Sequence, residues 1–153
     1  MDFTPLRDMT PEELASIFPN LNPQNHLITS PPVKEYNCVA WASGINNKRI
    51  DFYRNDMGEI DDDQSCTRYI EHFKTLGYIE CENSDFENGF EKIALYEDRR
   101  GDFTHVALQL EETKWTSKLG YLEDIEHLTL EALEGKGRDK YGNHTTYMKR
   151  EKK

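Results

Sequence analysis

The order of periodic segments along the chain constrains its fold more than any other sequence feature. The clearest segment is QSCTRYIEHFKTLGY, residues 64–78, in which Cys66, Tyr69 and Phe73 follow helical spacing. Shorter strand-like runs come after it: YIEC, KIALYE, FTHVALQL, WTSKL and KYGNHTTYMKR. The polar turn EETK between FTHVALQL and WTSKL predicts a hairpin. Helices followed by several antiparallel strands indicate the α+β class, with N-terminal helices packed on the sheet.

Two shorter helices are predicted nearer the N-terminus. In TPEELASIF, Thr10 and Glu13 have the spacing of a capping box. In NCVAWASG, Asn37 suits the N-cap and Gly44 suits the position after the last turn. A further short helix is predicted within IEHLTLEALEG.

The length of 153 residues suits one domain. We expect a helix and an extended lead-in over residues 1–34, a core over 35–147 and a basic tail over 148–153. This tail, MKREKK, is the only basic cluster, and the net charge is −10. Because binding to nucleic acid requires clustered Lys and Arg, we expect no nucleic-acid partner.

The chain shows no targeting or membrane signal. No segment approaches the ~20 apolar residues that a membrane helix needs, and the N-terminus lacks the pattern of a signal peptide. We therefore expect no membrane partner and a cytoplasmic protein with three free cysteines, with secretion by a signal-independent route as the alternative. The sequence leaves the oligomeric state open.

Cys38 is the first candidate for chemistry, because it follows the predicted N-cap of a helix. Free N–H groups at such a position stabilise a thiolate and can hold an oxyanion. The alternative is that Cys38 packs in the core, as free cysteines often do.

A thiol nucleophile needs a base, and His105 is the candidate because it opens the apolar strand THVALQL. Alternation places His105, Ala107 and Gln109 on one side and Val106 and Leu108 on the other. We expect the apolar side to enter the core and His105 to lie on the more polar side. The alternative is an ordinary surface histidine.

A third group would orient the histidine through its second ring nitrogen. Asp124 is the candidate in this sequence, with Ser117 and His127 as alternatives and Glu123 as a weaker one. Residue types alone do not choose among them. Either tryptophan, Trp41 or Trp115, would suit the wall of such a site or the core.

Metal and cofactor sites are not indicated. The histidines and cysteines show neither C-x-x-C nor H-E-x-x-H spacing. The acidic run Glu59–Asp63 lacks the spacing of a calcium loop. We therefore expect no metal and no cofactor.

NCVAWASG and THVALQL together resemble the signatures of papain-like cysteine hydrolases, especially the CHAP amidases and related cell-wall peptidases. The resemblance implies a papain-like core over residues 35–147 and an amide substrate in a peptide or protein. It also implies Cys38 as the nucleophile, His105 as the general base, and Ser117 or Asp124 as the polar third member from a neighbouring strand.

A wider set of segments resembles a family of small uncharacterised bacterial proteins: YNCVAWA, GFEKIALY, THVALQL, WTSKLG and DIEHLTLEALEG. This second resemblance implies no activity. Two functional hypotheses follow from the sequence. The first is a thiol amidase, peptidase or deamidase, and the second is a catalytically inactive binding or immunity-type protein on the same fold with a protein partner.

Overall fold

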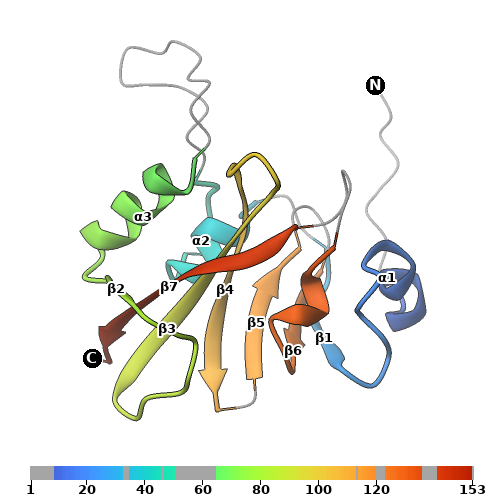
Figure 1. Cartoon of the computed structure of the whole chain (residues 1–153). Coiled ribbons are helices and arrows are strands. Elements are labelled where there is room, and N and C mark those ends of the chain that lie inside the picture. Colours follow the sequence, from blue (N-terminus) through green and yellow to red (C-terminus); the bar gives the residue numbers. More distant parts are fainter. Residues whose placement is uncertain are drawn as a thin grey trace.

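One antiparallel sheet organises the computed structural model (Figure 1). The structure describes residues 9–32, 35–45, 47–50, 65–112, 114–119, 123–135 and 141–152. The strands are β1 (His26–Ser30), β2 (Ile79–Cys81), β3 (Phe90–Glu97), β4 (Phe103–Glu111), β5 (Lys114–Lys118), β6 (Asp124–His127) and β7 (Asn143–Glu151). Their order across the sheet is β1-β6-β5-β4-β3-β7-β2, and every neighbouring pair is antiparallel. The helices are α1 (Pro11–Ile17), α2 (Cys38–Ala42), α3 (Cys66–Thr75) and the 3₁₀ helix η1 (Glu131–Leu133). The α+β class is confirmed.

The helices begin where their capping residues predict. Thr10 Oγ1 accepts a hydrogen bond from Glu13 N, and the Glu13 carboxylate accepts one from Thr10 N, which completes the capping box of α1. Asn37 caps α2 by accepting from Ala40 N at 3.1 Å. Gly44, just beyond α2, has φ +80°, a conformation that favours glycine. The three helices predicted before the strands are therefore confirmed.

Both faces of the sheet are covered by apolar side chains. Successive residues of a strand point to opposite faces. Face A carries Ala94, Tyr96, Ala107, Trp115 and Ile125, packed against Leu14 of α1 and Leu133 of η1. Face B carries Ile93, Leu95, Val106 and Met148, packed against Val39 of α2 and Phe73 of α3. The consecutive buried residues Ile93–Tyr96 of β3 reflect this burial on two sides.

The C-terminal segment differs from the expected basic tail. Residues 148–151 continue β7, and the Met148 side chain is fully buried on face B. The next two residues form ion pairs, Lys149 with Glu87 and Arg150 with Glu91, both at 3.0 Å. The high charge of the segment predicted a solvent-exposed tail, but the buried Met148 side chain holds the segment on the sheet.

Two other segments also form strands where the sequence suggested something else. The extended lead-in contains β1, which pairs with β6 at one edge of the sheet. The segment IEHLTLEALEG begins within β6, and its helical part is the three-residue η1. The acidic run Glu59–Asp63 lies outside the described residues. Within the described part of the chain, no helix has the length and apolar character needed to cross a membrane.

Candidate functional site

Cys38 is the first residue of α2, and α2 packs on face B. The thiol is half-buried and packs against the cluster that contains Val39 and Val106. Trp41, one turn further along, donates from its indole Nε1 to Thr116 Oγ1 of β5 at 3.0 Å. In Figure 1, α2 lies behind the strands of the sheet. Cys38 therefore belongs to the layer between α2 and face B.

His105 lies on face A, where it is part of a chain of hydrogen bonds. It pairs in register with Tyr96 of β3, a residue of the face A cluster, and its side chain is fully buried. Its Nε2 atom lies 2.9 Å from Ser117 Oγ, and the same Oγ lies 2.8 Å from Nε2 of His127. Nδ1 of His127 lies 2.8 Å from the carbonyl oxygen of Thr129. We call His105, Ser117 and His127 the His–Ser–His network.

The direction of every hydrogen bond in the network follows from the Thr129 carbonyl, which can only accept. Neutral His127 must therefore carry its proton on Nδ1, which leaves Nε2 to accept from the Ser117 hydroxyl. Ser117 has then used its own proton, so its oxygen accepts from Nε2–H of His105. His105 is left with an unprotonated Nδ1. This atom is buried and has no hydrogen-bond partner among the described residues.

Burial keeps both histidines neutral. Desolvation lowers the pKa of His127 to about 4 and that of His105 well below its ordinary range, with the neighbouring His127 adding to the second effect. The Tyr141 ring stacks flat on His105 with 4.2 Å between ring centroids. Burial, and then the charge of Cys38, raises the pKa of Tyr141. The network is therefore a neutral, enclosed chain at pH 7.

The structure joins His105 to Ser117 and His127 by hydrogen bonds, whereas Cys38 packs against the face B cluster. Val106, which packs with α2, and His105 are consecutive residues of β4, so their side chains point to opposite faces. The expectation that His105 lies on a polar side of the strand is wrong, because face A is a second apolar core. His105 Nδ1 forms no hydrogen bond with a described residue, while the charge of Cys38 reaches Tyr141, whose ring stacks on His105.

Asp124 also lies on face B, away from His105. It pairs in register with Lys118, and its carboxylate accepts a hydrogen bond from the Tyr36 hydroxyl. Burial raises the pKa of Asp124, while the hydrogen bond from Tyr36 and the charge of Lys118 oppose that shift. Burial lowers the pKa of Lys118, which the charges of Asp124 and Cys38 partly offset. Asp124 therefore belongs to a buried polar cluster on the same face as Cys38, and Ser117 holds the position beside His105 that was assigned to Asp124.

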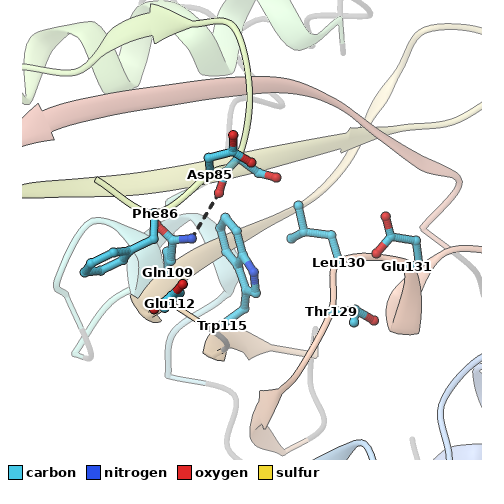
Figure 2. A pocket seen from close by; sticks show the side chains of 9 residues that line it. Asp85, Phe86, Gln109, Glu112, Trp115, Thr129, Leu130 and Glu131 are labelled. Atoms are coloured by element: carbon cyan, nitrogen blue, oxygen red, sulfur yellow. Dashed lines mark hydrogen bonds between the residues drawn. The ribbon is translucent and has the colours of Figure 1, made fainter. Parts of the chain in front are cut away.

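A pocket of about 410 Å³ opens on face A, beside the network (Figure 2). Its lining residues come from the segment before β3, from the β4–β5 hairpin and from the segment that leads into η1: Ser84, Asp85, Phe86, Gln109, Glu112, Trp115, Thr129, Leu130 and Glu131. Trp115 pairs in register with both Gln109 and His127. Gln109 Nε2 donates to the carbonyl of Ser84 at 3.0 Å, and this hydrogen bond connects the segment before β3 to β4 at the edge of the pocket. Trp115 thus lines this pocket, whereas Trp41 stacks with Tyr36 on the other face.

Comparison with known proteins places the chain in a family. A family model described as "Domain of unknown function (DUF7689)" matches residues 27–149. The chain belongs to this family. No curated protein and no solved structure matches the chain. The DUF7689 match runs from β1 into β7, so it includes the network, the pocket and Cys38.

Three residues that contact His105 or Asp124 were not predicted from the sequence: Tyr141, Tyr36 and Lys118. Tyr141 reaches His105 from a distant segment, and Tyr36 reaches Asp124 across 88 positions of the chain. Nothing in their immediate sequence signals these contacts. Lys118 could have been found, because strand alternation puts it on the opposite face from Ser117. Within the described residues, no three His, Cys, Asp or Glu side chains are arranged to hold a metal ion.

Proposed function

We propose that this DUF7689 chain is a binding protein in which Cys38 and His105 have structural roles. One observation carries the proposal: His105 is fully buried in the His–Ser–His network, while Cys38 packs against the face B cluster. A nucleophile and its base must come within hydrogen-bond reach. His105 Nδ1 has no such partner among the described residues, so thiol activation by His105 lacks its first requirement here.

The binding site in this proposal is the pocket around Trp115. Open pockets with aromatic walls and a few polar groups are typical of ligand sites. Thr129 belongs to this pocket and also fixes the direction of the network through its carbonyl. The network therefore has a structural task, since it holds β4, β5 and β6 in register beneath the pocket floor.

A thiol hydrolase acting on an amide, built on a papain-like core over residues 35–147, is the second candidate. The observation that favours it is the state of His105. Its Nε2 is held by a polar residue of the neighbouring strand, and its Nδ1 presents a bare lone pair, as a general base requires. In that hypothesis His105 takes the thiol proton as Cys38 attacks the amide carbonyl and gives it to the leaving amine, and water then hydrolyses the acyl-enzyme. Cys38 Sγ must come within hydrogen-bond reach of His105 Nδ1 for this reaction.

Alkylation rates separate the two candidates, because the chain contains a matched control. Cys38 and Cys81 are both half-buried, whereas burial raises the pKa of Cys66 to about 12. A binding protein should show Cys38 reacting with iodoacetamide at pH 7 at a rate within about tenfold of that of Cys81, with Cys66 slowest. An activated thiol would react more than about tenfold faster than Cys81, and such a rate would refute the proposal.

The binding role is tested through the two indole N–H signals in an ¹H–¹⁵N spectrum. The variant Trp41→Phe assigns them. Molecules that occupy the pocket should shift the Trp115 signal and leave the Trp41 signal in place. Turnover of an amide substrate that is lost in Cys38→Ala would instead establish the hydrolase.

A further inference from the structure

We propose that the Trp115 pocket takes the basic side chain of a lysine or arginine residue in a partner protein. This inference rests on the binding role proposed above and names the chemistry of its ligand. Three features of the pocket carry it: the charge at its rim, its aromatic walls, and one indole N–H that forms no hydrogen bond with a described residue.

Carboxylates surround the mouth of the pocket. Asp85, Glu112 and Glu131 all line it, and Figure 2 shows them distributed around Trp115. Glu131 pairs with His144 Nε2 at 3.1 Å, whereas Asp85 and Glu112 form no ion pair with any described residue. Their negative charge attracts a cation and repels an anion, in keeping with the net charge of −10.

The walls are suited to a cation. Trp115 and Phe86 are both lining residues, and aromatic ring faces attract ammonium and guanidinium groups within about 6 Å. The chain already shows this attraction at the rim, where Lys152 Nζ lies 5.9 Å from the centre of the Phe86 ring. Trp115 lies deeper, with 5% of its surface exposed. A long basic side chain could therefore lay its methylene groups against the indole while its charge stays beside Asp85 or Glu112.

The indole N–H of Trp115 points to the rest of the ligand. Most of the Trp115 side chain is buried, but its Nε1–H forms no hydrogen bond with a described residue and is accessible to a ligand. Figure 2 shows this nitrogen on the side of the ring that faces Leu130 and Glu131. A peptide carbonyl would accept from it. The pocket thus offers one donor for a backbone carbonyl and carboxylates for a cation, which together describe a basic residue within a polypeptide.

The test uses four small probes with the full chain, read through the Trp115 indole signal, with the Trp41 signal as internal control. N-acetyl-arginine amide and N-acetyl-lysine amide carry both features. N-acetyl-norleucine amide keeps the length and the carbonyl without the charge, and N-acetyl-glutamate amide reverses the charge. We expect the two basic amides to shift the Trp115 signal saturably and the other two to bind at least fivefold more weakly. Added salt should weaken the binding.

Variants of the rim supply the matched comparison. Asp85→Asn and Glu112→Gln should each weaken arginine amide roughly two- to fivefold, as expected for exposed ion pairs. Glu82→Gln removes an exposed charge that does not line the pocket and should leave the affinity unchanged. Circular dichroism confirms that each variant is folded, and the probe comparison needs no variant.

The outcomes separate this inference from the binding role. Binding of norleucine amide or glutamate amide at Trp115 as tightly as arginine amide would overturn the inference and keep the binding role. An unchanged affinity in both Asp85→Asn and Glu112→Gln would also overturn it. If none of the four probes shifts Trp115, the inference is rejected, and Cys38-dependent amide turnover would then reject the binding role as well.

Discussion

Lowering the pH from 7 to 5 should destabilise the fold through the His–Ser–His network. The pKa of His127 falls from 6.5 in an unfolded chain to about 4 in the folded protein because burial disfavours the charged ring. Between these two values the unfolded chain binds a proton that the folded protein does not. Stability is therefore fully present above pH 6.5 and declines as the pH falls towards 4.

The size of the effect follows from the same two values. For one group with pKa values of 6.5 and about 4, the loss between pH 7 and pH 5 is about 2 kcal/mol. His105 adds a loss of the same sign, because its pKa is also lowered. Protonating His127 on Nε2 also removes the acceptor of the Ser117 hydroxyl, which is how the charge would disrupt the network.

Urea unfolding at pH 7 and pH 5 and constant ionic strength measures this loss. The comparison is with His127→Gln, in which the loss should be smaller by about 2 kcal/mol. His144→Gln, which removes a histidine outside the network, is measured alongside as the control for loss of one imidazole. Asp124, whose raised pKa acts in the opposite direction, is present in all three proteins and cancels. Equal acid losses in the parent and His127→Gln would refute the reasoning.

Two stability predictions follow from other contacts. Ser117→Ala leaves Nε2 of both network histidines without a partner and should cost about 2–4 kcal/mol in urea unfolding. Ser16→Ala, which removes one exposed hydroxyl donor to Glu13 O, should cost no more than about 1 kcal/mol, and equal costs would contradict the network. Gly142 and Gly89 both have positive φ, but a Cβ on Gly142 would lie 2.1 Å from Glu97 O while one on Gly89 meets nothing within 4 Å. Gly89→Ala should therefore lower stability by about 1–2 kcal/mol, and Gly142→Ala by about 1–3 kcal/mol more, as measured by thermal or urea unfolding.

The elements that the sequence predicted correctly are those determined by neighbouring residues. The capping box of α1, the Asn37 cap of α2 and the β4–β5 hairpin each depend on residues a few positions apart. The pairing of β1 with β6 joins residues about a hundred positions apart, and no local pattern reports it. The prediction of a basic tail over residues 148–153 failed because Met148 is buried through the pairing of β7 with β3, which is also a long-range contact.

The sequence could have predicted the Ser117 partner of His105, because both residues belong to the β4–β5 hairpin. With Gln109 opposite Trp115, the register puts Ser117 opposite Ala107, two residues from His105 on the same face. Strand alternation alone therefore favours Ser117 over Lys118 as the partner of His105. His127 and Asp124 are different, because their faces depend on how β6 pairs with β5. The structure places the Asp124 carboxylate on face B, where it accepts a hydrogen bond from Tyr36.

Sequence alternation cannot determine which face of the sheet α2 covers. THVALQL offers two surfaces, with His105 and Ala107 on one and Val106 and Leu108 on the other, and both suit a helix as apolar as CVAWA. Covering face B gives α2 the larger side chains Ile93, Leu95 and Val106, and leaves face A to be covered by α1 and η1. This arrangement leaves one buried hydrogen-bond acceptor of the network without a donor among the described residues. Because the Thr129 carbonyl can only accept, each member of the network donates towards it, and the last member, His105, keeps an unpaired acceptor at Nδ1 beneath Tyr141. An unpaired buried acceptor costs about 1–3 kcal/mol, so any donor that reached Nδ1 would stabilise the protein by a comparable amount. The Cys38 thiol would be such a donor only if its sulfur came within hydrogen-bond reach of that atom.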